Sequence, residues 1–556
     1  MNTLESFSIL NRSAQLKALQ NERFDLIVIG GGITGAGIAL DSASRGLKTL
    51  LLEKGDFSSG TSSKSTKLIH GGLRYLKQFD FWLVKEVGSE RAIVHQLAPH
   101  LVLPEKMLLP LIEGGSYGKW LTSFGLKIYD ILAQVTDEDR RQMLNKEEAL
   151  RKEPLLPEEG LNGAGYYAEY RTDDSRLTIE IIKTSLNYGA KAINYIQVES
   201  FLYHNSGNVS GVMVRDLHSG QTMDVSADYV INAAGPWVDQ LRSQDGSRKG
   251  KRLHLTKGVH LVFPHYKLPV QQSVYFDVPD GRMIFAIPRG RVTYVGTTDT
   301  DYDGDPDKVH TELTDAVYLI AAVNHMFPSI DLQLEDVESS WAGLRPLIHE
   351  EGKSASELSR KDELFVSESG LISIAGGKLT GYRKMAERAV DQVAKALTEK
   401  GITPKPCQTD RIPLCGNQFK NFKEVKKYAS QIAERLEPFG VSEEKVWSLV
   451  TTYGAQTNQV LEGLDLKAED MQWQLLKAEL EFTLTHEMVT CPADFFIRRT
   501  GKLYFDIGAV RNYLKPVISI FQEKFGIGAE VAQQWENDLQ YEIALHSDFN
   551  PDKYTG

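Results

Sequence analysis

Two arginines stand in short, glycine-bearing motifs that are otherwise apolar. Arg74 lies in GGLRYL and Arg345 lies in GLRPL. A buried guanidinium is costly unless an anion meets it, and its planar fork binds an oxyanion through two hydrogen bonds. We therefore expect both arginines to face an anionic ligand. The alternative is that either arginine forms a structural ion pair with a protein carboxylate.

Two histidines could accept a proton. His260 follows Lys257 and Gly258 and opens the apolar run HLVF, so its imidazole is predicted to project from a strand start toward a cleft. His70 lies in a loop rich in hydroxyl groups. Histidine titrates near neutral pH, which suits a general base. A satisfied core histidine is the alternative for each, and the base stays open between His260, His70 and Arg345.

A glycine fingerprint near the N-terminus predicts a dinucleotide site. The apolar run at residues 24–29 predicts a buried parallel strand, and the motif Gly30-x-Gly32-x-x-Gly35 follows it. A helix is predicted over 34–45 and a second strand over 48–52, which ends in Glu53. Such glycines let backbone N–H groups approach a pyrophosphate, and the acidic residue accepts from a ribose hydroxyl. The alternative is a βαβ unit that binds nothing.

Further glycine-bearing segments indicate FAD rather than NAD. Residues 56–75 are small, polar and rich in hydroxyl groups, as expected of a loop along a long cofactor. The segments 229–237 and 371–383 each read as a strand followed by glycine. Together these features resemble the glutathione-reductase-like FAD fold of the D-amino-acid-oxidase type. In that fold the helix after Gly377 points its positive end at the flavin, and Lys378 adds a full charge beside the anionic reduced ring. The alternative for Lys378 is a solvated lysine at a helix start.

Seven motifs carry a closer resemblance. They are Thr61-Ser62-Ser63, the run from Lys67 to Leu76 (KLIHGGLRYL), Asn232 to Trp237, Lys257-Gly258-x-His260, Gly296 to Asp299, Gly343 to Pro346 and Gly376 to Thr380. In this order they resemble the FAD-dependent glycerol-3-phosphate dehydrogenase family over nearly the whole chain. The related glycerophosphate oxidases, which use oxygen, carry an insertion that this chain lacks between the motifs. An amine or amino-acid oxidase of the same fold, or a flavin-containing redox sensor, remains the alternative.

The resemblance implies oxidation of sn-glycerol 3-phosphate to dihydroxyacetone phosphate. It implies hydride transfer from C2 to flavin N5, with His260 taking the hydroxyl proton and Arg74 and Arg345 holding the phosphate. Tyr75 and Thr380 are expected to contact the substrate. Non-covalent FAD is expected, because none of the three cysteines lies near the motifs. The cofactor-binding residues expected are Gly30, Gly32, Gly35, Glu53, Thr61, Ser62, Ser63, Lys67, Leu68, His70, Gly71, Gly72, Val198, Ala234, Gly235, Gly376, Gly377, Lys378, Leu379 and Thr380.

The chain of 556 residues is too long for a single core, so two or three domains are expected from its length. The fold class is α/β, with a discontinuous FAD-binding domain at 1–100, 160–255 and 345–400. Alternating runs at 258–300 predict an antiparallel sheet, and 101–159 with 256–344 are assigned to this substrate-binding cap. Helical spacing of apolar residues such as Val425, Ala429 and Ile432 predicts an all-helical domain at 405–556.

Composition and charge limit the partners. The net charge of −11 argues against a nucleic-acid binder. We expect no signal peptide, no transmembrane helix and no metal, since His486-Glu487 lacks the second histidine of HExxH. The resemblance implies a cytoplasmic protein attached peripherally to the membrane, where it passes electrons to a quinone. The segment 119–132 places Trp120 and Phe124 at helical spacing, which suits a bilayer interface or, more commonly, core packing. A homodimer is compatible with the resemblance, but the sequence does not decide it.

Overall fold

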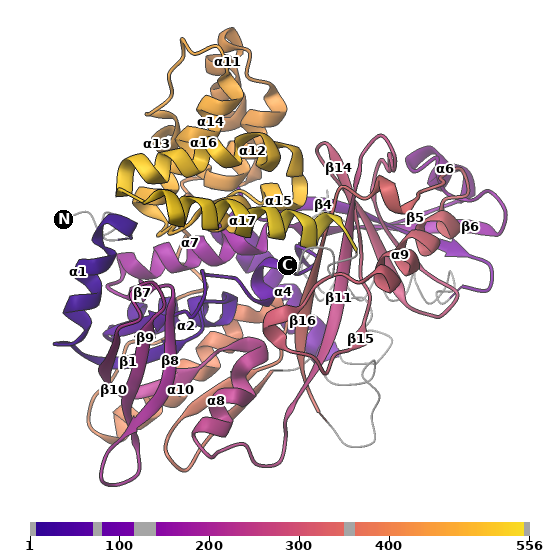
Figure 1. The fold of residues 1–556 in the computed structure, drawn as a ribbon. Coiled ribbons are helices and arrows are strands. Elements are labelled where there is room, and N and C mark those ends of the chain that lie inside the picture. The colour runs from indigo at the N-terminus through magenta and orange to yellow at the C-terminus, as the bar shows by residue number, and fades with distance from the viewer. Residues whose placement is uncertain (1–6, 71–80, 116–140, 350–361, 550–556) are drawn as a thin grey trace.

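The computed structural model describes residues 7–70, 81–115, 141–349 and 362–549, and no side chain of 81–84. Two β-sheets and a C-terminal group of helices form the described part (Figure 1). The first sheet lies at the left of the view, the second extends to the right, and the C-terminal helices, drawn in orange and yellow, cover the top. The predicted segment 119–132 lies outside the described residues.

The first sheet is parallel at its centre. Its strand order is β17-β18-β10-β1-β2-β7, with β9 beside β10 and β8 beside β9. β1 pairs in parallel with β2 and β10, and β2 and most of β1 are buried on both faces, as their apolar runs predict. The strands are β1 (Arg23–Ile29), β2 (Thr49–Leu52), β7 (Lys191–Ile193), β8 (Ile196–Tyr203), β9 (Val209–Asp216), β10 (Thr222–Asn232), β17 (Glu363–Val366) and β18 (Ile372–Ala375).

Helices cover this sheet and complete the FAD-type fold predicted from the sequence. The helix predicted over 34–45 is α2, which contacts both α7 and α10. Gly37 of α2 lies against Tyr382 of α10, where a Cβ would come within 2.9 Å of the ring, so glycine permits this close packing. The helices of this part are α1 (Ile9–Leu19), α2 (Ile33–Ser44), α4 (Phe81–Leu97), α7 (Asp174–Asn187), α8 (Val238–Gln244) and α10 (Tyr382–Glu399).

The second sheet is mostly antiparallel, as predicted. Its order is β15-β11-β14-β13-β12-β4-β6-β3, with β16 beside β11 and β5 beside β6. Only the β12 and β4 pairing is parallel among the described pairs of this sheet. The strands are β3 (Leu68–Ile69), β4 (Leu103–Ile112), β5 (Gln142–Leu144), β6 (Leu161–Arg171), β11 (Leu253–Pro264), β12 (Ser273–Asp277), β13 (Met283–Arg289), β14 (Val292–Gly296), β15 (Thr300–Asp301) and β16 (Ser339–Ile348), and helices α6 (Lys146–Lys152) and α9 (Leu313–Met326) lie on it.

Sheet membership differs from the predicted segments at several strands, among them β3 of segment 1–100, which pairs with β6 of the second sheet. β6 falls in the segment 160–255 that the sequence assigned to the FAD-binding domain, yet it pairs along its length with β4 of the second sheet. β16 crosses residue 345 and pairs with β11 throughout. The strands that follow β6 and β16 along the chain, β7 and β17, belong to the first sheet again.

The C-terminal part is helical, as predicted. Val425, Ala429, Ile432 and Leu436 are buried along one face of α11, and Ser442 caps α12 by accepting from the N–H of Lys445. The helices are α11 (Phe422–Leu436), α12 (Glu443–Tyr453), α13 (Thr457–Leu461), α14 (Met471–His486), α15 (Lys502–Phe505), α16 (Ile507–Phe525) and α17 (Ala529–Ser547).

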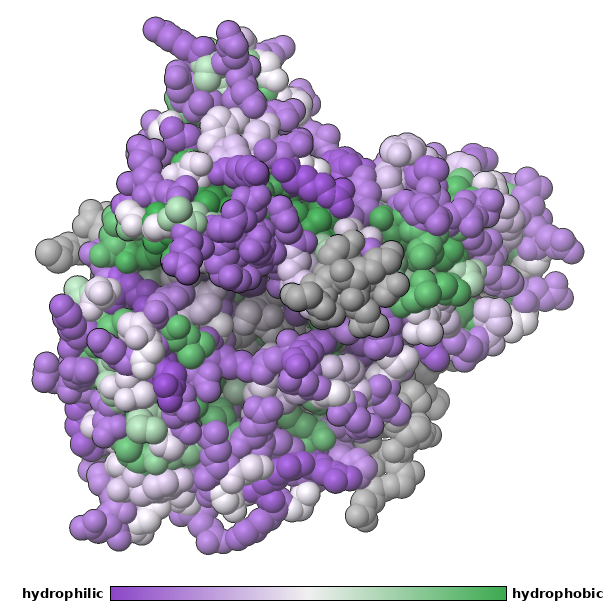
Figure 2. All heavy atoms as spheres, viewed as in Figure 1, coloured by the Kyte–Doolittle hydropathy of each residue, from purple (hydrophilic) through white to green (hydrophobic). Residues whose placement is uncertain are grey.

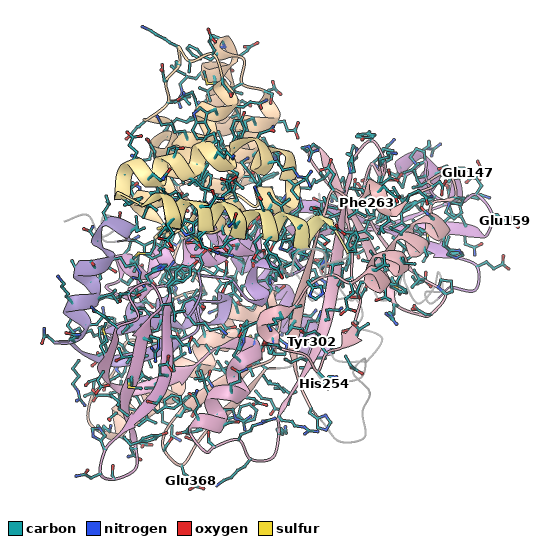
Figure 3. The ribbon with its side chains drawn as sticks, viewed as in Figure 1. Glu147, Glu159, His254, Phe263, Tyr302 and Glu368 are labelled. Carbon is teal, nitrogen blue, oxygen red and sulfur yellow. The ribbon has the colours of Figure 1, made fainter. Side chains whose placement is uncertain are left out.

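On the face that Figure 2 shows, hydrophilic residues predominate and several green, apolar areas lie among them, one of them near α9. Leu313 and Val317 of α9 are 48% and 55% exposed. Figure 3 labels charged side chains at the periphery, with Glu147 and Glu159 at the outer end of the second sheet. Within the described ranges no helix combines the length and apolar character that crossing a bilayer requires, and no group of side chains is arranged to hold a metal ion.

Candidate active site

Both sheets line one cavity of about 920 Å³. From the first sheet come the glycine turn after β1, the segment after β10 and the turn after β18. From the second sheet come His260 of β11 and Arg345 of β16, together with Tyr275 and Phe285. The site therefore assembles segments that lie hundreds of residues apart in the sequence.

The glycine turn after β1 has the backbone that its sequence predicts. Gly30 has φ near 109°, and a Cβ there would come within 2.6 Å of the Ala233 carbonyl oxygen. A Cβ at Gly35 would collide with the carbonyl oxygen of Gly30, so α2 can approach the turn only with glycine at that position. The first amide of α2, Ile33 N, donates to Ser62 Oγ at 2.8 Å. A helix start held this way presents N–H groups to an anion such as a pyrophosphate.

Glu53 fixes the backbone of the glycine turn. Its two carboxylate oxygens accept from Gly31 N at 2.6 Å and Gly55 N at 2.7 Å, which holds the glycine turn against the strand that follows. Burial raises the pKa of the Glu53 carboxyl, and the two backbone N–H groups oppose that rise. The side chain also lines the cavity, so contact with a ribose hydroxyl stays a prediction.

The turn after β18 also lines the cavity. Gly376 and Gly377 have φ near 81° and 79°, a conformation that favours glycine. Lys378 then precedes a short 3₁₀ turn, Leu379–Gly381, which leads directly into α10. Thr380 Oγ1 donates to the carbonyl oxygen of His70 at 3.2 Å. The loop bearing His70 and the glycine turn thus meet, as the predicted flavin site requires.

Arg345 lies flat across β11. Its guanidinium passes over Gly258, where any Cβ would collide with it. One nitrogen meets Asp299 Oδ1 and the carbonyl oxygen of Thr298, each at 3.2 Å, and the other donates to Thr297 Oγ1 at 2.8 Å. The carboxylate partner foreseen by the alternative interpretation is therefore present, although Arg345 also lines the cavity.

His260 is buried and firmly packed. Its ring stacks on Trp341 at 4.8 Å between centroids and an angle of 13°. Its Nε2 lies 3.0 Å from Thr66 Oγ1. Burial, followed by the positive charges of Arg345 and Lys67, holds the pKa of His260 well below its usual value. These influences favour the neutral imidazole, whose lone pair can accept a proton.

Most of the predicted site residues line the cavity. These are Gly30, Gly32, Glu53, Thr61, Ser62, Leu68, His70, Val198, Ala234, Gly235, His260, Arg345, Gly376, Gly377, Lys378, Leu379 and Thr380. Gly35 and Ser63 lie behind the lining, and the Lys67 ammonium turns away to form a buried ion pair with Asp174 at 2.5 Å. Gly71, Gly72, Arg74 and Tyr75 lie outside the described residues.

Three cavity residues carry contacts that the sequence did not suggest. Thr66 bonds His260, and Thr297 and Asp299 hold Arg345. Each lies in a segment that the sequence marked, 56–75 or 296–299, so the position was visible. The role was not visible, because the partner of each lies at least 46 residues away.

The cavity fits FAD on its own geometry. Its volume stands near the upper end of the range for ligand pockets, and both the glycine turn after β1 and the Gly376-Gly377 turn line it, which suits a dinucleotide. Trp237 Nε1, on the cavity wall, is buried and has no partner within the described segments. Fold and cavity together define an FAD-dependent oxidoreductase.

Comparison with known proteins narrows this class. A family model described as FAD dependent oxidoreductase matches residues 25–383, and one described as the C-terminal domain of alpha-glycerophosphate oxidase matches 407–532. Aerobic glycerol-3-phosphate dehydrogenase of Bacillus subtilis (strain 168) is 50% identical over 93% of this chain and 94% of its own length. That of Staphylococcus aureus (strain USA300) is 47% identical over 98% of this chain and 99% of its own.

A solved structure agrees. The glycerol-3-phosphate dehydrogenase of Bacillus halodurans, complexed with FAD, is 43% identical and superposes with a TM-score of 0.83 over 98% of this chain and 99% of that one. The chain belongs to the family of aerobic, FAD-dependent glycerol-3-phosphate dehydrogenases.

Proposed function

We propose that the chain oxidises sn-glycerol 3-phosphate to dihydroxyacetone phosphate with FAD as the immediate electron acceptor. The observation that carries the proposal is the single cavity in which Arg345 and His260 face the glycine turns of an FAD fold. Family membership supplies the substrate, since the relatives are named for it.

Arg345 is proposed to bind the phosphate. It stays charged at any working pH and offers two parallel N–H donors, which match a phosphate better than a point charge does. The contacts with Thr297 and Asp299 hold the guanidinium in place before the substrate arrives. Arg74, with Tyr75, is proposed as a second contact from the segment that the structure does not describe. Thr380 is proposed to contact the substrate from the part of the cavity lining beside His70. Its hydroxyl proton is donated to the His70 carbonyl oxygen, so its oxygen would accept from a substrate hydroxyl.

His260 is proposed as the group that takes the proton of the C2 hydroxyl. Its depressed pKa keeps it neutral and ready to accept. His70 lies on the same cavity and packs edge-on against Phe285, with 6.1 Å between ring centroids. We assign His70 to orienting the ligands rather than to proton transfer. When bound, FAD accepts the C2 hydride at N5. Lys378 and the helix start after it place positive charge at that end of the cavity.

The proposal extends to the membrane. The family resemblance supports transfer of electrons to a quinone by a protein attached peripherally to the cytoplasmic face of the membrane, and the segment 119–132 is the proposed contact. A homodimer is proposed on the same resemblance. Flotation with vesicles of bacterial lipid, reduction of a short-chain quinone, and light scattering in solution test these three points separately.

The test of the activity is an anaerobic titration of the FAD-loaded protein. Adding glycerol 3-phosphate should bleach the visible flavin absorbance, whereas glycerol, which lacks the phosphate, should leave it nearly unchanged at the same concentration. A flavin that stays oxidised with glycerol 3-phosphate contradicts the proposal. If the reduced protein then consumes oxygen rapidly, the enzyme is a glycerophosphate oxidase instead.

A further inference from the structure

The segment around Thr66 is fixed against the second sheet. Tyr294 Oη donates to the carbonyl oxygen of Thr66 at 3.1 Å, and Trp341 Nε1 donates to the carbonyl oxygen of Ser65 at 3.1 Å. The next residue, Lys67, is anchored by its ion pair with Asp174. Three successive residues are thus tied to buried partners, so the backbone of Thr66 has a defined position on the cavity wall.

The imidazole of His260 cannot turn easily. Trp341 covers one face, and a Cβ at Gly296 would collide with the ring, which shows how closely the backbone of β14 approaches it. Only 1% of the residue is exposed. Nδ1 is buried without a partner among the residues the structure describes, while Nε2 meets the Thr66 hydroxyl at 3.0 Å. Nε2, the ring nitrogen that has a polar contact, is therefore linked to the cavity by the Thr66 hydroxyl.

A threonine hydroxyl can donate one hydrogen bond while it accepts another. Thr66 also lines the cavity, so its oxygen can meet a ligand hydroxyl while its proton points at Nε2. We propose that the Thr66 hydroxyl relays the substrate proton to His260. This proposal rests on the proposed function, because it needs a substrate hydroxyl that is oxidised.

The relay balances in protons and electrons. The O–H bond of the substrate breaks and its proton passes to Thr66 Oγ1. The proton that Thr66 held passes to Nε2 of His260, so Thr66 ends as a neutral hydroxyl and His260 as an imidazolium. The C2–H bond pair leaves as the hydride that the FAD of this family accepts. Two protons are therefore in flight in one step, whereas direct transfer to His260 would move one.

The first test removes the hydroxyl without changing the shape of the side chain. Thr66→Val should lower the rate of anaerobic flavin reduction by glycerol 3-phosphate on the order of 10²-fold or more, the usual size of a proton-transfer contribution. Thr66→Ser, which keeps the hydroxyl, should stay within a few fold of the natural protein. The FAD dissociation constant should not change in either variant, because the backbone contacts of Thr66 remain. Thr66→Ser should keep the natural melting temperature, whereas Thr66→Val should lower it modestly, because Nε2 of the buried His260 loses its partner.

The chain offers a matched control. Thr293 on the same sheet also contacts a histidine, His265, at 3.0 Å, but neither residue lines the cavity. Thr293→Val should leave the flavin reduction rate unchanged. A Thr66→Val protein that reduces its flavin at the natural rate overturns the relay. If the natural protein itself fails to reduce its flavin, the proposed function has failed instead.

The second test uses the natural protein and so does not depend on the folding of any variant. The flavin reduction rate is measured in mixtures of H₂O and D₂O. If two protons move in the measured step, a plot of the flavin reduction rate against the deuterium fraction should be curved. Thr66→Ser should give the same curvature. A straight line, or no solvent isotope effect, would mean that Thr66 carries no proton.

Discussion

Two regions of the molecule bury charge, and they do so differently. The first, called here the seam, joins α7 to the C-terminal helices through Arg176, Glu180, Lys183, Gln456 and Glu487. Arg176 meets Glu180 and Glu487 at 2.5 Å each, and Lys183 meets the same two carboxylates at 3.2 and 3.0 Å. The second region is the cavity, where Arg345 meets Asp299 at 3.2 Å and also contacts the Thr298 carbonyl oxygen and the Thr297 hydroxyl.

The difference separates a structural charge from one placed for a ligand. In the seam, cations and carboxylates are all buried and share short contacts, so the charges of Arg176 and Lys183 are balanced by those of Glu180 and Glu487. In the cavity, Arg345 is about one fifth exposed along its side chain and faces a space large enough for a ligand. An arginine of the second kind can exchange neutral oxygens for an arriving phosphate.

The two buried histidines repeat this contrast. His100, beside the seam, has no partner on either ring nitrogen within the described ranges, and lies between the loops of Gly416 and Gly454. His260 has a hydroxyl partner that reaches the cavity. Burial depresses the pKa of both residues, so burial alone does not identify a base. What marks His260 is its polar link to the ligand space.

The largest expected effect lies in the seam. Burial favours the neutral form of Glu487, but Arg176 and Lys183 outweigh it and lower the pKa of this carboxyl. Glu487→Gln leaves two buried cations short of a charge and should cost about 3–5 kcal/mol of unfolding free energy. Urea unfolding of the FAD-loaded protein measures it. In the control, Glu199→Gln removes the surface partner of Arg215 and should cost less than about 1 kcal/mol. Equal losses of unfolding free energy in the two variants would mean that the buried ion pairs of the seam contribute no more than a surface pair.

The next largest effect concerns the cavity. Arg345→Ala should keep FAD bound and raise KM strongly, with a loss of about 2–5 kcal/mol in kcat/KM, because a fixed phosphate contact is gone. The control is Arg291→Ala, which removes an arginine of the same sheet that pairs with Glu338 at 2.7 Å away from the cavity lining. Steady-state kinetics of the two variants measure KM and kcat/KM. Unchanged KM with lowered stability would make Arg345 a structural ion pair of Asp299.

A smaller effect depends on pH. Burial, with Arg176 and Lys183 nearby, lowers the pKa of His100 to about 3, while a histidine in the unfolded chain titrates near ~6.5. The unfolded chain therefore takes up the proton first, so stability is full above about pH 6.5 and falls as pH drops toward 3. At pH 5 the loss should be about 2 kcal/mol.

His100→Leu should remove this part of the pH dependence, as measured by urea unfolding at pH 7 and pH 5. Phe419, whose ring lies 6.3 Å from His100, provides the control, since Phe419→Leu loosens packing but leaves the histidine in place. The Phe419 variant should lose stability equally at both pH values. A His100→Leu protein with the natural pH slope would contradict this account.

Local patterns predicted the elements that surround the cofactor. The run at 24–29, the glycines and Glu53 follow one another within a single βαβ unit, so periodicity and spacing were enough to foresee β1, α2 and β2. The four alternating runs at 258–300 likewise predicted the antiparallel strands, because alternation reports one buried face.

Long-range pairing was not visible in the sequence. The sequence of β6 is compatible with a strand of either sheet. Only its pairing with β4 shows that it belongs to the second sheet. Lys67 stands among cofactor-loop residues, yet its charge is taken by Asp174, 107 residues away. Thr66 and His260 are 194 residues apart. Sequence spacing carries no information about such contacts, so the predictions named the right segments but missed these roles.

The most direct test of the account is a crystal structure of the FAD-loaded protein with dihydroxyacetone phosphate bound. We expect the phosphate on the guanidinium of Arg345, and the C2 oxygen next to the Thr66 hydroxyl and His260. A phosphate bound elsewhere, with Arg345 still held by Asp299 and Thr297 and turned from the ligand, would contradict the central claim that this arginine is placed for the substrate.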